Sequence, residues 1–485
     1  MARFEVPEGW TAQAYRFALD PTSGQDRALA QHAGAARFCF SHMLGHARAV
    51  LEQRAAERTY GIAEAELTPV LGWSLPALRR EWNARKQDAA PWWAENSKEA
   101  YNTGLDGLAR ALDGWNKSRR GARAGKAVGF PRFKTKARSR ASVRFTTGTI
   151  RVEPGRHHVT LPRLGTMKTH ETTRKLARRI ENGTARILSA TAARDRAGRW
   201  YVSFQVLVQR QTVRPAHLGV SPHRVVGVDV GVRDLLVVAA ADGTEVDRVP
   251  APRSLGHAQA RLRQLQRKAA RQLGPCDPVT QTMRAPSNRW RCTQSRIGKS
   301  HARTARIRRD RLHKATTVLA HRHEVIVVET LNAAGMRARG GAHKRGLNRA
   351  LADAALAEIR RMLAYKTRWY GSILTEAGRW YPSSKTCSAC GGRKPSLTLA
   401  ERTYVCEHCG VVLDRDLNAA TNLARLHETR TGERSPAGSG PVAGRGADRE
   451  TEPAQAGDAG GREASTPHSQ PADKTGTAAP QGTAA

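Results

Sequence analysis

Cys387-Ser-Ala-Cys390 is followed after fifteen residues by Cys406-Glu-His-Cys409 and then by Asp414-Arg-Asp416-Leu-Asn418, and this is the most informative stretch of the sequence. Two CxxC pairs at this spacing predict one zinc site, because each pair places two sulfur atoms on a tight turn and two such turns can surround one ion. Four thiolates close the coordination shell, so the predicted zinc is structural and His408 is expected to be a bystander. The predicted zinc ligands are Cys387, Cys390, Cys406 and Cys409.

Two acids, Asp414 and Asp416, follow the second cysteine pair within seven residues, on a chain that is otherwise strongly basic. Zinc seldom needs carboxylates beside a complete thiolate set. These acids are therefore predicted to serve another purpose, and magnesium chemistry on nucleic acid is the leading hypothesis.

The composition predicts a polyanionic partner. The chain has 485 residues, with 81 Lys+Arg against 42 Asp+Glu and a formal net charge of +39. Each phosphate contacted by Lys or Arg releases condensed counterions, which drives binding that does not depend on base sequence. A merely solubilising basic surface is the alternative interpretation. Binding to a membrane surface is disfavoured, because the positive charge runs through the whole chain and is not confined to one amphipathic helix.

Cysteine usage and hydropathy indicate the cellular compartment of the protein. No run approaches ~18 consecutive apolar residues, so no transmembrane span is expected, and residues 1–7 lack the apolar core of a signal peptide. Beyond the four predicted zinc ligands, Cys39, Cys276 and Cys292 have no motif partner. Unpaired cysteines suit a reducing compartment, so we expect a cytoplasmic protein associated with nucleic acid and not with a membrane.

The amino-terminal region alternates between strand and helix patterns. Residues 15–19 alternate apolar and polar side chains as a strand does, and Thr22 with Gln25 predicts a capping box at the start of a helical region that reaches about residue 119. Further strand patterns lie at residues 142–146, 158–161, 186–195 and 200–208. We interpret these as a small β-domain, a barrel interrupted by helices, and assign residues 1–215 to one lobe. Core packing is favoured over base stacking for its tryptophans, Trp73, Trp82, Trp92, Trp93 and Trp115.

The second half predicts a mixed α/β domain. Buried strand patterns lie at residues 225–231, 235–240, 245–249, 324–329 and 372–377, and one amphipathic helix is predicted over 348–371. Residues 251–320 are helical and carry 17 Lys/Arg against two acids, Asp277 and Asp310, which favours a phosphate-tracking surface. Residues 274–290 interrupt this pattern as an inserted loop. A helix follows at 417–426, and from about residue 428 the composition predicts a disordered tail over 428–485.

Three acids stand out by their context. Asp229 and Glu329 each end a buried apolar strand, and Asp416 begins a helix. Lone acids at such positions are usually caps or partners of basic residues, but three of them in a chain of this charge favour a shared role. Clustered carboxylates repel each other unless a cation neutralises them, and Mg²⁺ prefers oxygen ligands and retains waters. Two such ions about 4 Å apart can support cleavage of a phosphodiester.

Taken together, the motifs resemble the TnpB family of transposon-encoded, RNA-guided DNA endonucleases, which is regarded as ancestral to the type V CRISPR effectors. The resemblance runs from about residue 11 to 427, and its carboxy-terminal motifs are highly specific in combination. The motifs are Gly227-Val-Asp-Val-Gly231, Val328-Glu-Thr-Leu-Asn332, Ser383-Ser-Lys-Thr-Cys387, the second cysteine pair and Asp414-Arg-Asp-Leu-Asn-Ala-Ala-Thr-Asn422.

The resemblance implies a RuvC nuclease domain of RNase H-like fold, over 220–380 and 411–427, split by a zinc ribbon at 381–410. It implies an amino-terminal β-barrel with an inserted helical bundle that holds guide RNA and target DNA beside a short target-adjacent motif, with sequence read by base pairing. By position, Asp229, Glu329 and Asp416 match the catalytic, magnesium-binding carboxylates, and Asp414 ranks second to Asp416. The inserted loop and the tail depart from the family's compact pattern.

Two other functions stay open at this point. A nuclease-silent, RNA-guided DNA-binding regulator would not need the three acids. A transposase that acts directly on DNA ends also uses three acids on an RNase H-like fold, but the zinc ribbon directly before the last motif disfavours it. The sequence does not define the oligomeric state.

Overall fold

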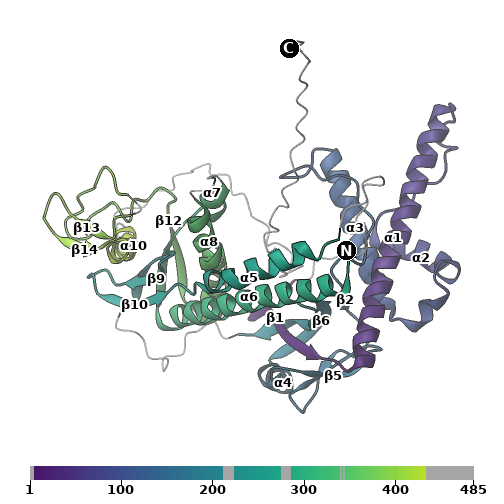
Figure 1. Ribbon diagram of the computed structural model, residues 1–485, viewed down its shortest axis with the longest axis horizontal. Coiled ribbons are helices and arrows are strands. Elements are labelled where there is room, and N and C mark those ends of the chain that lie inside the picture. Colours follow the sequence, from purple (N-terminus) through teal and green to yellow (C-terminus); the bar gives the residue numbers. More distant parts are fainter. Residues whose placement is uncertain are drawn as a thin grey trace, which may run out of the picture. The chain divides into compact units, whose positions relative to one another are not determined.

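The computed structural model describes residues 5–210, 223–274, 286–338, 341, 344–398 and 400–432 (Figure 1). The chain divides into two compact units, Met1–Glu433 and Arg434–Ala485, and every described residue belongs to the first. Most of the loop predicted at 274–290, and the predicted tail beyond residue 432, lie outside the described residues. Within the described part of the chain, no helix combines the length and the apolar character needed to cross a membrane.

The amino-terminal part begins with one strand and continues as a group of helices. These elements are β1 (Trp10–Asp20), α1 (Ser23–Thr59), α2 (Leu75–Ala89), the 3-10 helix η1 (Pro91–Glu95) and α3 (Lys98–Arg119). The predicted capping box is confirmed, because the backbone N–H of Gln25 donates to Thr22 Oγ1 and that of Thr22 donates to Gln25 Oε1. Gly104 allows α3 to pack closely on α1, since a Cβ there would lie 2.4 Å from the carbonyl oxygen of Ala36.

The tryptophans of these helices pack into the core, as predicted. Trp82 is buried, and Trp73, Trp92 and Trp93 are partly buried against the same apolar cluster. The Trp115 ring meets the Phe130 ring edge-on, with centroids 5.0 Å apart. Their apolar area therefore stabilises the amino-terminal part.

Seven antiparallel strands form the amino-terminal sheet, in the order β2-β6-β7-β1-β5-β4-β3. With β1 these are β2 (Ser142–Phe145), β3 (Arg151–Val152), β4 (His158–Leu161), β5 (Gly165–Thr169), β6 (Ala185–Arg194) and β7 (Trp200–Gln209), and α4 (Arg174–Glu181) precedes β6. In the described chain β2 pairs only with β6 and β3 only with β4. The predicted barrel therefore stays a prediction.

A second, five-stranded sheet has the order β10-β9-β8-β11-β12. Its strands are β8 (Val225–Asp229), β9 (Asp234–Ala239), β10 (Glu245–Pro250), β11 (Val325–Glu329) and β12 (Ile373–Ala377). The meander β8-β9-β10 is antiparallel, whereas β11 pairs in parallel with both β8 and β12. The carboxyl ends of β8, β11 and β12 consequently share one edge of the sheet.

Helices cover both faces of this sheet. On one face, Val226 and Val228 pack in a cluster with residues of α6 (Asn288–Arg322) and α9 (Leu356–Tyr370). On the other face, Val327 packs with Leu423 of α10 (Arg415–Gly432). Alternate residues of each strand thus face different helices, as the pleat of a strand requires. The basic helix α5 (Ser254–Arg271) lies beside α6 (Figure 1).

Two helix boundaries differ from the sequence prediction. The single helix predicted over 348–371 is two helices, α8 (Arg345–Ala354) and α9, because Ala355 between them adopts a left-handed conformation with φ of 51°. A residue in the left-handed conformation commonly ends a helix, and it is usually glycine. Here the residue is alanine, so the sequence did not indicate the break. The helix predicted at 417–426 extends to Gly432, so the prediction that order ends near residue 428 was wrong for 428–432. A short helix, α7 (Ala333–Ala338), follows β11.

The segment between β12 and α10 contains little regular structure. Its strands β13 (Thr403–Val405) and β14 (Val412–Asp414) form a two-stranded sheet, and Thr386 and Arg393 form an isolated bridge. Tyr404 is fully buried there beside Cys387 and Cys406. So small a core leaves the fold of this segment dependent on a further stabilising element.

Candidate metal centres

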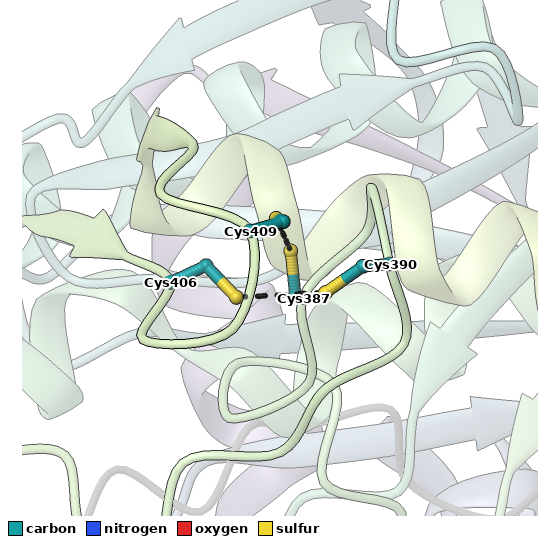
Figure 2. Close-up of side chains that lie close together, drawn as sticks. All are labelled: Cys387, Cys390, Cys406 and Cys409. Carbon is teal, nitrogen blue, oxygen red and sulfur yellow. Dashed lines mark hydrogen bonds between the residues drawn. The ribbon is translucent and has the colours of Figure 1, made fainter.

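Four sulfur atoms meet at the predicted zinc site, which we call the thiolate cluster (Figure 2). The ligand atoms of Cys387, Cys390, Cys406 and Cys409 all lie within 4.8 Å of one another. The Cys387 and Cys409 sulfurs are 3.8 Å apart, and those of Cys390 and Cys406 are 3.5 Å apart. A tetrahedron with Zn–S bonds of about 2.3 Å has sulfurs about 3.8 Å apart, so the arrangement fits one zinc ion.

The second turn of the thiolate cluster favours the thiolate form of Cys406, whereas the neighbouring thiols raise the pKa of Cys390 to about 12. Hydrogen bonds from the backbone amides of Cys409 and His408 lower the pKa of the Cys406 thiol to about 6. Deprotonated sulfur is the form that binds zinc. The His408 ring packs on Gly392, where a Cβ would lie 2.4 Å from its Cδ2, and His408 is not in the metal-binding group.

The three predicted acids, which we call the carboxylate cluster, come together at the carboxyl edge of the five-stranded sheet. Parallel pairing places Val228 of β8 opposite Val328 of β11. Asp229 and Glu329 are the next residues and therefore end adjacent strands side by side. Asp416 lies in the first turn of α10, the helix that packs on β8.

Gly227 explains how α10 comes so close to β8. A Cβ at this position would lie 1.9 Å from the carbonyl oxygen of Ala420 and 2.5 Å from the backbone nitrogen of Ala424. Only a residue without a side chain allows this approach. Asp416 lies one helical turn before Ala420, and Asp229 lies two residues after Gly227, so this contact sets the first turn of α10 beside the end of β8.

The electrostatics of the carboxylate cluster favour a bound cation. Burial, followed by the charges of Glu329 and Asp416, raises the pKa of Asp229 well above its usual value. Burial also raises the pKa of Glu329 and of Asp416, the latter further through Asp414. Acids with raised pKa values hold protons until a cation replaces them. All three side chains are half-buried and therefore keep access to solvent.

The carboxylate cluster is looser than the thiolate cluster. Among the described residues, the four cysteines are the group of three or more potential ligands whose atoms gather within 4.8 Å. An all-oxygen donor set with room for waters suits Mg²⁺, which keeps part of its hydration shell. The residues present are therefore compatible with magnesium, and they contain none of the sulfur or nitrogen ligands that zinc prefers.

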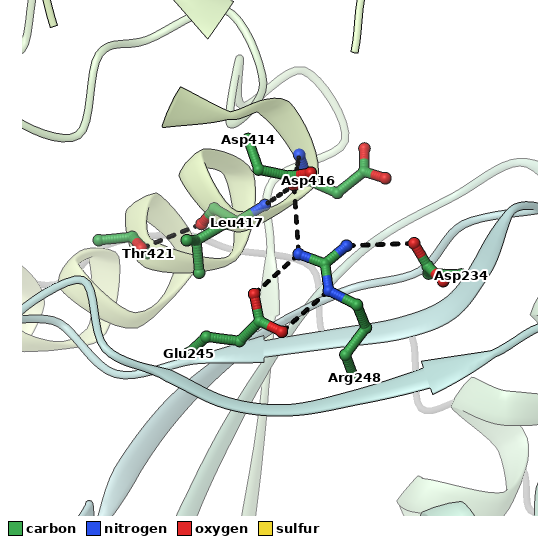
Figure 3. A network of polar contacts seen from close by, with 7 residues as sticks. All are labelled: Asp234, Glu245, Arg248, Asp414, Asp416, Leu417 and Thr421. Atoms are coloured by element: carbon green, nitrogen blue, oxygen red, sulfur yellow. Dashed lines mark hydrogen bonds and ion pairs between the residues drawn. The ribbon is translucent and has the colours of Figure 1, made fainter. Parts of the chain in front are cut away.

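Asp414 has a different role from Asp416 (Figure 3). Its Oδ1 accepts hydrogen bonds from the backbone N–H groups of Asp416 and Leu417, at 3.0 and 2.9 Å, so it caps α10. The same oxygen lies 3.4 Å from a guanidinium nitrogen of Arg248. Asp414 Oδ1 is thus already engaged by the helix and by Arg248, and the ranking of Asp416 above Asp414 as a metal ligand stays a prediction.

Sequence reasoning missed the arginine at the centre of this network. Arg248 of β10 also forms ion pairs with Glu245 at 2.8 Å and with Asp234 at 3.1 Å. It thereby ties the hairpin β9-β10 to the start of α10. The sequence did not predict these ion pairs, because the partners of a single Arg in a strand are determined by how the strands pair.

The basic helices α5 and α6 form a groove of about 510 Å³, lined by Arg261, Gln264, Leu265, Lys268 and Arg296. Arg261, Lys268 and Arg296 belong to the run that predicted a phosphate-tracking surface. The groove places their positive charge on one surface, as contact with a polyanion requires.

Comparisons with known proteins identify the family. Residues 203–339 match the family described as "Probable transposase", 357–423 match "Cas12f1-like, TNB domain", and 11–55 match "Helix-turn-helix domain". The chain is 44% identical over 483 residues, 97% of each chain, to a Mycobacterium tuberculosis protein named "Putative RNA-guided DNA endonuclease". This chain belongs to the TnpB family. A relative of the same name in Escherichia coli is 28% identical over 85% of this chain and 91% of its own.

Solved structures are also similar, among them the "Cryo-EM structure of the Cas12f1-sgRNA-target DNA complex". Its TM-score is 0.42 and its identity 12%, over 86% of this chain and 99% of that one. In this TnpB family member, the region matched as a helix-turn-helix domain is the strand β1 followed by the single helix α1.

Proposed function

We propose that this TnpB family member is an RNA-guided, magnesium-dependent DNA endonuclease of a transposable element. The observation that carries the proposal is the meeting of Asp229, Glu329 and Asp416 at one sheet edge. Similarity over 85% to 97% of the chain to proteins named as RNA-guided DNA endonucleases supports the guide and target as partners. The net charge of +39 fits a protein that holds two nucleic acids.

The sheet β8–β12 with α10 serves as the RuvC-type nuclease domain in this proposal, and the segment from residue 381 to 410 serves as its zinc ribbon. Asp229, Glu329 and Asp416 would hold Mg²⁺, and zinc would occupy the thiolate cluster as a structural ion. Bound Mg²⁺ supplies activation of the attacking water and charge stabilisation of the leaving oxygen. The amino-terminal lobe and the groove between α5 and α6 bind nucleic-acid backbone through Lys and Arg.

The residues around the acids each make a definite contribution. Asp414 caps α10 and so fixes the backbone at Asp416. Arg248 holds Asp414 and offsets part of the local negative charge. Gly227 keeps α10 against the sheet, so that a carboxylate from residue 416 reaches those from 229 and 329. Preorganisation of this kind reduces the reorganisation needed during the reaction.

A nuclease-silent regulator is the second candidate, and the meeting of the three acids at one sheet edge argues against it. A protein that only binds DNA gains nothing from three acids held together at a cost in electrostatic repulsion. A transposase that acts on DNA ends would also use them, but it would not need a guide RNA.

The test is to express the protein with its flanking genomic DNA, purify it and sequence any bound RNA. The complex is then added, with Mg²⁺, to a plasmid carrying the guide-matched target beside a randomised flank. The proposal predicts guide-dependent linearisation that is lost in Asp229→Ala, while target binding persists. Cutting that survives Asp229→Ala would refute the assignment of this residue. Binding without cutting by the wild-type complex would identify a regulator instead.

A further inference from the structure

A buried serine joins the carboxylate cluster to the base of the zinc ribbon. Ser383 lies between β12 and the first cysteine pair, and its hydroxyl donates a hydrogen bond to Oε1 of Glu329. The serine is 2% exposed, whereas Glu329 is half-buried. One carboxylate oxygen of Glu329 is therefore held on the protein side, which limits how the other can turn toward solvent.

Two asparagines of α10 hold the backbone around this serine. Asn422 Nδ2 donates to the carbonyl oxygens of Ser383 at 2.8 Å and of Thr386 at 2.7 Å. Asn418 Nδ2 donates to the Thr386 carbonyl oxygen at 2.7 Å, and its Oδ1 accepts from the backbone N–H of Ser388 at 2.8 Å. Ser388 lies inside the first cysteine pair, so these bonds reach the thiolate cluster.

The burial of these groups makes the connection a rigid one. Asn418 is fully buried and Asn422 is 4% exposed. Tyr381 adds a bond from its hydroxyl to the carbonyl oxygen of Asn422, at 3.1 Å. Buried hydrogen-bonding groups cannot exchange their partners for water, so the orientation of each one is determined by the others.

We propose that Ser383 is a positioning residue that orients Glu329 of the carboxylate cluster for metal binding, on a backbone segment that Asn418 and Asn422 hold in place. The inference rests on the proposed function, because it takes Glu329 as a metal ligand. It also gives the asparagines of the last motif a role: they couple the zinc ribbon to the nuclease site. Polar groups that orient metal ligands are generally required for full affinity.

The test compares Ser383→Ala with wild type, and Mn²⁺ binding followed by electron paramagnetic resonance is the first readout. Loss of an orienting partner generally costs about 10- to 100-fold in metal affinity or activity, so Mn²⁺ affinity should fall by that factor. Single-turnover cleavage at limiting Mg²⁺ should fall similarly and recover as Mg²⁺ is raised. Target-DNA affinity and zinc content should be unchanged.

Three further variants complete the experiment. Ser383→Thr keeps the hydroxyl and should retain most of the Mn²⁺ affinity, and Asn422→Ala should share the defect of Ser383→Ala. Ser384→Ala, at the adjacent half-buried position, is the matched control and should bind Mn²⁺ as wild type does. Mn²⁺ affinity and cleavage unchanged in Ser383→Ala would overturn the inference.

The two proposals fail in different ways. If the wild-type complex never cuts guide-matched DNA, the proposed function fails. Weaker Mn²⁺ binding in Ser383→Ala, at a site that Asp229→Ala removes, would still support the positioning role. If cleavage occurs and Mn²⁺ binding does not depend on Ser383, only the further inference is lost.

Discussion

The thiolate cluster and the carboxylate cluster differ in how the chain builds them. The four cysteines lie within 23 consecutive positions, from Cys387 to Cys409, on two local turns. The three acids span residues 229 to 416 and meet only because β8 and β11 pair in parallel and α10 packs on Gly227. We therefore expect the fold of the first cluster to depend on a bound ion, whereas the second has a scaffold that does not require one.

The electrostatics of the two clusters follow the same division. At Cys406 backbone amides stabilise the charged thiolate, whereas burial and neighbouring acids disfavour the charged form of Asp229. A closed structural site favours permanent binding of its ion. A half-buried site whose carboxyl groups have raised pKa values suits an ion that exchanges with solvent and contacts substrate. Loss of a ligand should accordingly lower the folding stability at the thiolate cluster and raise it at Asp229 of the carboxylate cluster.

Two acids of one motif should differ strongly in their effect on cleavage. Asp416→Asn should reduce cleavage by on the order of 10³-fold, because metal binding supplies several kcal/mol of charge stabilisation and each ~1.4 kcal/mol changes the rate about tenfold. Asp414→Asn should cause only a small loss, since Asn also caps helices well. Single-turnover cleavage of guide-matched DNA measures both. Equal losses in the two variants would contradict the division of roles between them.

Loss of one zinc ligand should unfold the ribbon while sparing the sheet. In Cys406→Ser, amide hydrogen exchange should become fast through the ribbon, since structural zinc contributes on the order of 10 kcal/mol to the folding of small domains. Exchange in β8 and β9 should stay slow, because their burial does not depend on zinc. Cys292→Ser, at an exposed position of α6, is the matched control and should leave exchange unchanged. Fast exchange in β8 would show that the sheet does depend on zinc.

A single methyl group should disturb the packing that assembles the carboxylate cluster. Gly227→Ala places a Cβ against the backbone of α10, and overpacking of this kind costs about 1–3 kcal/mol of unfolding free energy. Cleavage should fall together with stability, because Asp416 moves with its helix. Gly256→Ala is the control, since a Cβ there meets nothing within 4 Å and helical Ala is favoured over Gly by about 0.5–1 kcal/mol. Wild-type stability in Gly227→Ala would disprove this close contact.

The smallest expected effect is a gain of stability. The folded protein binds the proton of Asp229 more tightly than the unfolded chain does, because its folded pKa is raised above 3.8. The stability from this proton is fully present below pH 3.8 and is lost as the pH rises through the raised pKa. In Mg²⁺-free buffer at neutral pH, Asp229→Asn should therefore melt a few degrees above wild type.

The coupling of proton binding to folding also predicts how the stability gain of Asp229→Asn depends on pH and on Mg²⁺. The difference in melting temperature between Asp229→Asn and wild type should shrink as the pH falls toward 4, and it should shrink again when Mg²⁺ neutralises the wild-type acids. A melting temperature below that of wild type in Mg²⁺-free buffer would show that the Asp229 charge is stabilised by groups other than a cation.

Local features of the fold could be predicted from the sequence, and long-range ones could not. The cysteine pairs, the capping box at Thr22 and the strands that end in Asp229 and Glu329 each follow from residues close together in the chain. Spacing and alternation carry that information directly. The assignment of the three acids as catalytic ligands remains a prediction.

What the sequence could not provide depends on sheet order and helix packing. Ser383 bonds to a residue 54 positions away, and Arg248 meets Asp414 only because β10 is near α10. The helix break at Ala355, where the backbone is left-handed, was not indicated by a glycine or proline at that position. Such features result from tertiary packing overriding local preference, so pattern analysis does not detect them.

The most direct test of the central claim is anomalous diffraction from crystals soaked in Mn²⁺, measured at the manganese and zinc edges. We expect manganese bound by the carboxylates of Asp229, Glu329 and Asp416, and zinc at the four sulfurs. Manganese bound instead at Asp414 and Glu245, with none at Asp229, would contradict that claim.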